Sequence, residues 1–320
     1  MPVINSSYKA PLWIGGKHAQ TIIPNIFRKV SPAPIYMRER TLTADHDFLD
    51  LDFSSQGHDR LAIITHGLEG NSSSSYVLGM VKEFNANQWD VLAWNFRSCG
   101  GELNHSIRLY HAGSTDDLQH VIEHVLKMKK YKEIVLIGFS LGANIILKYL
   151  GEQAEEVPRE ISKAIAVSAP CDLFACIQAL SSGINRIYIK HFLLTLKSKM
   201  IKKAKKFPEI FSGIKISKIQ HIIEFDNLIT APLCGFKDAF HYYSECSSKK
   251  NISEIRVPTL ILNAQNDPFL HPSSFPYEEC QKSRFVTLET PYDGGHIGFI
   301  KKRLMGKYWM EERAIDFVSK

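Results

Sequence analysis

The chain has 320 residues, of which 44% are hydrophobic and 22% charged, and its formal net charge is +6. This composition is typical of a globular protein with ample material for a core, and it excludes disordered and collagen-like chains. The excess of Lys and Arg is mild and spread along most of the chain, so we expect no nucleic-acid partner.

Six cysteines are scattered without a C-x-x-C pair or a regular spacing. This pattern argues against a disulfide framework or a zinc ribbon and favours a reducing compartment. The first twenty residues lack the basic-then-apolar pattern of a signal peptide, and no stretch approaches 18 uninterrupted apolar residues. We therefore expect a cytoplasmic protein without a membrane-spanning helix, and attachment to a membrane surface stays open.

The predicted elements begin with two segments in which polar and apolar residues alternate, 36–42 and 48–54, which favour an antiparallel pair at the edge of a sheet. Short apolar runs rich in β-branched residues follow and predict buried strands. These runs are 61–67, 90–96, 133–139, 163–169, 259–264 and 285–290. Helical patterns occur at 75–88, 116–130, 144–156 and 307–320. This alternation predicts the α/β class, with a mostly parallel twisted sheet and helices on both faces.

The alternation stops between residues 171 and 250, where no clear strand pattern is found. We interpret this stretch as a helical cap insertion. The expected organisation is a first part of an α/β core at 1–170, the cap at 171–250, and a second part of the core at 251–320.

One short motif, GFSLG at 138–142, connects a predicted strand to a predicted helix and fits G-x-S-x-G. In a nucleophile elbow, a sharp strand-to-helix turn exposes the serine hydroxyl, and the flanking glycines leave room for the turn. The pentapeptide alone is a weak signal, because an ordinary tight turn with a solvent-facing serine also fits it. Its place between strand and helix favours Ser140 as a nucleophile.

A serine nucleophile needs a base to take its proton and a carboxylate to orient that base. His296 lies in a glycine-rich loop after the last predicted strand, and Asp267 follows the strand before it. Both lie at the carboxyl ends of strands, where α/β sheets collect their reactive groups. Asp293 is the alternative orienting group, but it is only three residues from His296. This serine chemistry needs no metal and no cofactor.

A tetrahedral intermediate also needs donors for its oxyanion. We expect the N–H of Leu141, directly after the nucleophile, and the N–H of Leu68 in the loop that follows an early strand. His66, in the same loop, is interpreted as a structural residue that shapes the loop and does not titrate in catalysis.

Several longer blocks carry a family resemblance: HGLEGNSSSSY, WNFRSCGGELN, RLYHAGSTDDL, GFSLGANIILKYLGE, the NDP loop and GGHIGF. Together they resemble the YheT-like branch of the α/β-hydrolase superfamily over nearly the whole chain. The resemblance implies an α/β-hydrolase fold with a helical cap and a triad of Ser140, Asp267 and His296. It also implies hydrolysis of carboxylic esters or acylglycerols.

Two other sequence patterns could indicate a metal site or membrane contact. HVIEH at 120–124 fits an inverted zinc-protease motif, but its helix is amphipathic and solvent-facing histidines are the better interpretation. The segment 190–207 is a basic amphipathic helix with an apolar stripe, and after Lys190 six more lysines cover most of the remainder. The stripe is Leu193, Leu196, Met200, Ala204 and Phe207, and the lysines are Lys197, Lys199, Lys202, Lys203, Lys205 and Lys206. We favour a cap helix that packs the stripe over the pocket and shows its lysines to water, while peripheral membrane contact is also open.

The function that these patterns predict is hydrolysis of carboxylic esters through an acyl-enzyme on Ser140. An apolar cap favours acyl chains of medium length or longer, including monoacylglycerols. Acyl transfer to an alcohol and a catalytically silent binding protein are the alternatives.

Overall fold

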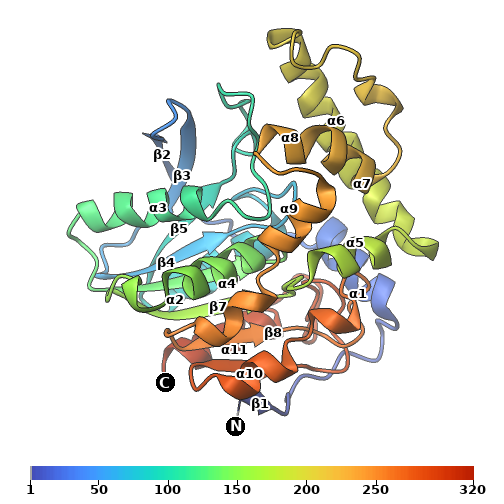
Figure 1. The fold of residues 1–320 in the computed structure, drawn as a ribbon. Coiled ribbons are helices and arrows are strands. Elements are labelled where there is room, and N and C mark those ends of the chain that lie inside the picture. The colour runs from blue at the N-terminus through green and yellow to red at the C-terminus, as the bar shows by residue number, and fades with distance from the viewer. Residues whose placement is uncertain (1) are drawn as a thin grey trace.

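A nine-stranded sheet forms the centre of the molecule in the computed structural model, which describes residues 2–320 (Figure 1). The strands are β1 (Val3–Ile4), β2 (Met37–Leu42), β3 (Phe48–Ser54), β4 (Arg60–Thr65), β5 (Asp90–Asn95), β6 (Glu133–Phe139), β7 (Ile161–Val167), β8 (Thr259–Leu262) and β9 (Val286–Glu289). Their order is β1-β9-β8-β7-β6-β4-β5-β3-β2. All neighbours are parallel except β3 with β5 and β2 with β3. The predicted α/β class and the antiparallel edge pair are therefore confirmed.

Helices cover both faces of this sheet. The helices are α1 (Lys17–Phe27), α2 (Ser75–Ala86), α3 (Thr115–Lys127), α4 (Leu141–Gln153), α5 (Leu173–Leu180), α6 (Arg186–Lys206), α7 (Ile222–Phe225), α8 (Ala231–Leu233), α9 (Ala239–Cys246), α10 (Tyr277–Lys282) and α11 (Trp309–Val318). Side chains of α3 and α4 share one hydrophobic cluster with the sheet, and those of α2 and α11 share another on the opposite face. Because the central strands are buried on both faces, their sequences are continuous apolar runs.

The strand β3, which lies between β5 and the edge strand β2, contains buried charged residues. All of its residues are buried, including Asp50 and Asp52. The guanidinium of Arg38 donates to the Asp52 carboxylate at 2.7 Å, and that of Arg40 donates to Asp50 at 2.7 Å. These charge-assisted bonds to β2 compensate the loss of hydration of the two carboxylates.

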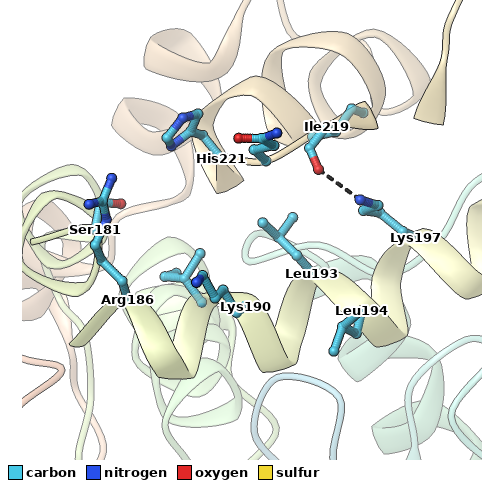
Figure 2. A pocket seen from close by; sticks show the side chains of 10 residues that line it. Ser181, Arg186, Lys190, Leu193, Leu194, Lys197, Ile219 and His221 are labelled. Carbon is cyan, nitrogen blue, oxygen red and sulfur yellow. Dashed lines mark hydrogen bonds between the residues drawn. The ribbon is translucent and has the colours of Figure 1, made fainter. Parts of the chain in front are cut away.

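Residues 171–250 contribute no strand to the part of the sheet that the structure describes, and they contain α5 to α9. The long helix α6 crosses this region (Figure 1), and its side chains face the segment 219–221 across a cavity (Figure 2). The treatment of 171–250 as a separate cap between two parts of a core stays a prediction. No helix within residues 2–320 is both long enough and apolar enough to cross a membrane.

The apolar stripe of α6 is buried, but not against the pocket as its sequence pattern predicted. Leu193, Leu196 and Met200 pack with side chains of 211–229 in a third hydrophobic cluster, which also includes Leu109 and Phe269. The prediction that this stripe covers the pocket is therefore wrong. The reason is that α6 contacts protein on two sides, so a different set of its residues lines the pocket.

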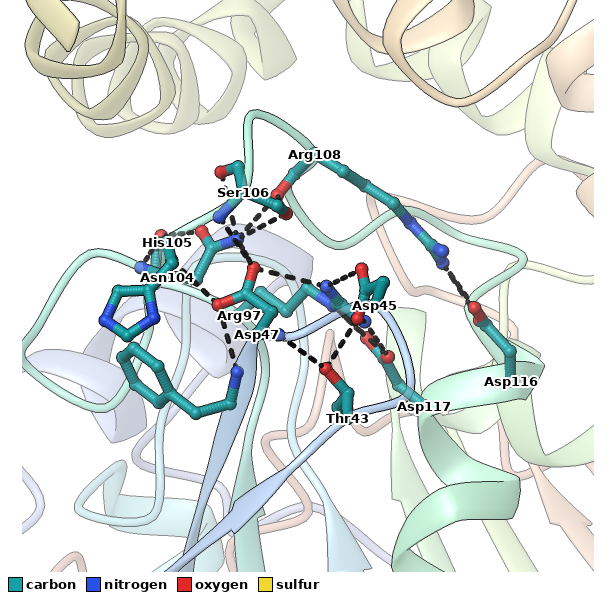
Figure 3. A network of polar contacts seen from close by, with 12 residues as sticks. Thr43, Asp45, Asp47, Arg97, Asn104, His105, Ser106, Arg108, Asp116 and Asp117 are labelled. Carbon is teal, nitrogen blue, oxygen red and sulfur yellow. Dashed lines mark hydrogen bonds and ion pairs between the residues drawn. The ribbon is translucent and has the colours of Figure 1, made fainter.

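A buried polar network fixes the loop that follows β5 (Figure 3). The Arg97 guanidinium lies 2.7 Å from Asp117 and 3.3 Å from Asp47, and all three side chains are buried. The Asp47 carboxylate accepts the backbone N–H of Ser106 at 3.0 Å. The ammonium of Lys203 on α6 in turn donates to the carbonyl of Ser106. Lys203 is therefore buried against this loop, and the expectation that it faces water is wrong.

The HVIEH histidines belong to α3 and lie half-buried against β2. His120 Nε2 is 2.9 Å from Thr41 Oγ1, and His124 Nε2 is 2.8 Å from Glu39 Oε1. These side chains are only partly exposed, so the expectation that they face solvent is not met. The reason is that β2 extends over the helix surface that carries them.

Candidate active site

Ser140 lies in the turn between β6 and α4. Its backbone has φ 51° and ψ −117°, a conformation that residues with a side chain rarely adopt. The Ser140 N–H donates to the carbonyl of Val167 at 2.9 Å, which ties the turn to the neighbouring strand β7. Strain held in place by surrounding structure in this way is characteristic of functional sites.

The two motif glycines are required by close backbone contacts. A Cβ on Gly138 would lie 2.6 Å from Ala143 Cα. A Cβ on Gly142 would lie 2.4 Å from the carbonyl oxygen of Thr65 and 2.5 Å from that of His66. Any side chain at either position would push α4 away from β4 and β6. The spacing of the motif therefore follows from how closely the helix approaches the sheet.

The structure brings the three predicted triad residues together. His296 Nε2 lies 2.9 Å from Ser140 Oγ, and His296 Nδ1 lies 2.8 Å from Asp267 Oδ2. With a proton on Nδ1 donated to the carboxylate, Nε2 is free to accept the serine proton. The side chains of Asp267 and His296 are almost entirely buried. Serine, imidazole and carboxylate thus form one continuous line of hydrogen bonds.

Asp293, the alternative orienting carboxylate, has other partners. Its Oδ1 accepts from Asn266 Nδ2 at 2.9 Å and from Gln20 Nε2 at 3.3 Å. It therefore joins α1 to the loop after β8, which fixes the position of the histidine loop without contacting the imidazole.

Helix α1 positions the imidazole, a contribution that was not predicted from the sequence. Thr21 Oγ1 accepts the backbone N–H of His296 at 2.9 Å, and Gln20 Oε1 accepts that of Gly294 at 2.8 Å. The ring of Phe269 stacks on the imidazole with a centroid distance of 3.9 Å and an interplanar angle of 16°. The only sequence signal for these roles is the amphipathic pattern of residues 17–27, which does not reveal its partner.

The predicted oxyanion donors lie on either side of the serine turn. Leu141 is the first residue of α4, so its N–H belongs to the helix terminus that lacks intrahelical acceptors. In the loop after β4, the N–H of Gly67 donates to Tyr76 Oη at 3.0 Å and that of Glu69 to Tyr110 Oη at 2.9 Å. Within residues 2–320, no acceptor is found for the N–H of Leu68 between them. This loop therefore fixes its other amides and leaves Leu68 available.

His66 is buried beneath this loop. Its Nε2 accepts the backbone N–H of Phe96 at 3.1 Å, so Nδ1 carries the proton and donates to the carbonyl of Gly67 at 2.7 Å. Burial lowers the pKa of His66 to about 3, so the ring is neutral at physiological pH. These contacts agree with a role in shaping the loop.

An ion pair joins the same loop to α6. Lys199 Nζ lies 2.8 Å from Glu69 Oε1, and the side chains are only 19% and 6% exposed. Tyr110 Oη donates to the same carboxylate oxygen at 2.7 Å. The expectation that Lys199 faces water is wrong, because α6 passes directly over the loop at this position. No pattern in the sequence indicated that Glu69 and Lys199 would pair beside the site.

A cavity of about 450 Å³ opens above Ser140. Its walls come from α1, the loop after β4 and α6, and most of them are apolar or aromatic. The lining includes Ile22, Ile26, Leu68, Tyr76, Ile187, Tyr188, Phe192, Phe269 and Ile297. A hydroxyl, an imidazole and unpaired amides at one end of an apolar cavity suit an ester whose acyl chain lies along the walls.

Comparison with known proteins places this geometry in a family. A family model for the alpha/beta hydrolase fold matches residues 63–187. The chain is 32% identical to YheT of Escherichia coli, over 94% of this chain and 90% of that protein. It is also 32% identical to a monoacylglycerol lipase of Saccharomyces cerevisiae, over 81% of this chain but 59% of that protein.

A solved structure shares the fold at much lower sequence similarity. An esterase of Pyrococcus furiosus superimposes with a TM-score of 0.60 at 17% identity, covering 89% of this chain and 90% of that one. The architecture, the elbow at Ser140 and the near full-length match to YheT agree with one another. The chain therefore belongs to the YheT-like branch of the α/β-hydrolase superfamily.

Proposed function

We propose that the protein hydrolyses carboxylic esters with Ser140 as nucleophile, His296 as general base and acid, and Asp267 as the group that orients the imidazole. The observation that carries the proposal is the line of hydrogen bonds from Asp267 through His296 to Ser140 at the end of an apolar cavity. Relatives named as esterases and lipases support ester hydrolysis over the two alternatives.

The reaction follows from the positions of these groups. His296 Nε2 takes the Ser140 proton as Oγ attacks the ester carbonyl, and the buried Asp267 carboxylate stabilises the resulting imidazolium. The N–H groups of Leu68 and Leu141 stabilise the oxyanion of the tetrahedral intermediate. His296 then protonates the departing alcohol, which leaves an acyl-enzyme. A water molecule deprotonated by the same imidazole releases the acid and restores the serine.

The cavity lining supports a finer proposal about the substrate. Ile22, Phe192 and Ile297 provide apolar surface that a short acyl group would leave uncovered. Each buried methylene group contributes about 0.8 kcal/mol of transfer free energy. We therefore expect preference for esters with acyl chains of medium length or longer, including monoacylglycerols.

Labelling and mutation test the nucleophile. A fluorophosphonate probe should modify Ser140 and no other residue. Ser140→Ala should lower kcat by on the order of 10³-fold or more, because the triad acts as a unit. Ser73 is an exposed serine in the segment between β4 and α2, so Ser73→Ala is the matched control and should behave as wild type. Folded protein that gives no adduct on Ser140 would refute the proposal.

The chain length of the substrate is tested separately. A series of p-nitrophenyl esters from acetate to laurate, together with monoacylglycerols, should show kcat/KM rising with acyl length. A series that is flat or falls with length would remove the apolar-chain proposal and leave the hydrolase proposal standing.

The cellular setting is the last part of the proposal. The cysteines are all free, which supports a reducing compartment such as the cytoplasm. Peripheral membrane contact through 190–207 is supported by the exposed residues Leu194, Lys202 and Lys205. Sedimentation with anionic vesicles tests it, since Lys202→Glu with Lys205→Glu should release a bound protein. Equal sedimentation of both forms would exclude this contact.

A further inference from the structure

A second cavity lies on the other side of α6 from the catalytic cavity. Its volume is about 590 Å³, within the roughly 300–1,000 Å³ of small-molecule sites. Residues 186–197 of α6 form one side and residues 219–221 the other (Figure 2). Ile187 and Phe192 of the same helix line the catalytic cavity. The helix is therefore a wall shared by two cavities, with a different face toward each.

The side chains of this second cavity carry uncompensated positive charge. Arg186, Lys190 and Lys197 line it at spacings of four and seven residues, which places them on one face of α6. No Asp or Glu is among the lining residues, and within residues 2–320 no ion pair is found for any of the three. Lys197 Nζ donates to the carbonyls of Ser217 and Ile219, at 2.7 and 2.8 Å. Carbonyl oxygens orient that ammonium but do not neutralise it.

Glu224, the acidic residue that follows the segment 219–221, does not neutralise the positive charge of the cavity. Glu224 Oε2 accepts the backbone N–H of Gln220 at 3.1 Å and is not part of the cavity lining. The cavity thus presents three cations to any occupant, and it favours an anionic group at that point.

Four of the other lining residues are apolar, and the polar residues Ser181, Gln220 and His221 complete the lining. Ile189 and Leu193 are buried at the base of the cavity, and Ile219 closes the opposite side. Leu194 also lines it but is 69% exposed. Burying a leucine side chain is worth about 1.5–3 kcal/mol relative to leaving it in water. An occupant with an apolar tail would cover this side chain, and a small hydrophilic anion would not.

We propose that this cavity binds a monomeric amphiphile whose headgroup is anionic, either a carboxylate or a phosphate monoester, and whose tail is apolar. The headgroup lies between Arg186 and Lys190, and the tail lies over Leu193 and Leu194. The site is separate from Ser140, so the proposal does not depend on the proposed hydrolysis.

Calorimetric titration of the full chain with laurate, dodecyl phosphate and dodecanol tests the proposal. Laurate or dodecyl phosphate should bind at least about tenfold more tightly than neutral dodecanol, and the tighter of the two identifies the headgroup. The double variant R186Q/K190Q should weaken that binding at least about tenfold. The double variant K202Q/K205Q removes the same charge from exposed positions of α6 outside the cavity and should change it less than about twofold.

Comparison of the variants separates binding in the second cavity from binding in the catalytic cavity. If the catalytic cavity also takes up the amphiphile, that binding event is common to all variants, because none of the four substituted residues lines it. Leu194→Gln should weaken binding of the amphiphile while the melting temperature stays near that of wild type. Equal affinities in R186Q/K190Q and wild type, equal weakening in K202Q/K205Q, or equal affinity for dodecanol would each overturn the proposal.

Discussion

The ion pair between Lys199 and Glu69 offers a direct test of whether α6 supports the oxyanion loop. Lys199→Met keeps most of the length of the side chain but removes its charge. The Glu69 carboxylate would then lie buried beside Leu68 with Tyr110 Oη as its remaining side-chain donor. The carboxylate should relax toward water and carry the Leu68 N–H with it.

The expected magnitude follows from the burial of the pair. Removing one partner of a fully buried ion pair costs about 3–5 kcal/mol of stability. Lys199 is 19% exposed and Glu69 keeps its Tyr110 hydrogen bond, so we expect about 2 kcal/mol and a melting temperature lower by about 4 °C. Loss of a whole oxyanion donor costs about 10²–10³-fold in rate, so a displaced donor should cost about tenfold in kcat. KM should change by less than about twofold.

Steady-state kinetics and thermal unfolding of three variants complete the test. Glu69→Gln with Lys199→Met leaves no unpaired charge, and the amide still accepts from Tyr110, so the double variant should recover at least about half of the lost stability and rate. Lys202→Met, an exposed lysine of the same helix, is the control and should match wild type within about 0.5 kcal/mol. If Lys199→Met is less stable but has an unchanged kcat, the pair holds α6 in place and has no part in catalysis.

Three further tests probe other parts of the structure. Asp267→Asn should lower kcat by about 10⁴-fold, as in triads where the orienting carboxylate was replaced. Asp293→Asn should keep most activity because Oδ1 remains an acceptor. The reverse ranking of the two variants in a p-nitrophenyl ester assay would contradict the assignment of Asp267. Gly142→Ala should fail to fold or lose several kcal/mol in urea unfolding, since its Cβ would meet two carbonyl oxygens, whereas Gly15→Ala, with nothing within 4 Å, should be tolerated. Burial raises the pKa of Asp226 from 3.8 to about 6, so the folded state binds this proton more tightly and stability falls as pH rises through that window. Asp226→Asn removes this pH dependence, so the stability of the variant relative to wild type should improve by up to about 3 kcal/mol between pH 4 and pH 7. If the curves of stability against pH are parallel for the variant and wild type, Asp226 does not titrate in this range.

Local sequence determined much of this protein. The strands β4 to β9 match the predicted runs, because a strand buried on both faces must be apolar throughout. The elbow was predictable because its glycines are required by close backbone contacts with residues a few positions away and with one adjacent strand. The candidate triad could be proposed because its members follow the ends of strands, and the carboxyl ends of parallel strands meet at one edge.

Contacts between distant segments were decided only by the tertiary structure. Thr21 and Gln20 hold the histidine loop across more than 270 positions of the chain, and no periodicity indicates that pairing. The apolar stripe of α6 was recognised, but its partner was assigned wrongly, and Lys199 and Lys203 were placed in water although both are largely buried. The physical reason is that a helical pattern reports which residues share a face, whereas the neighbour of that face is set by packing. On a helix that contacts protein on several sides, even a lysine can be directed inward by a carboxylate or a carbonyl that the rest of the fold supplies.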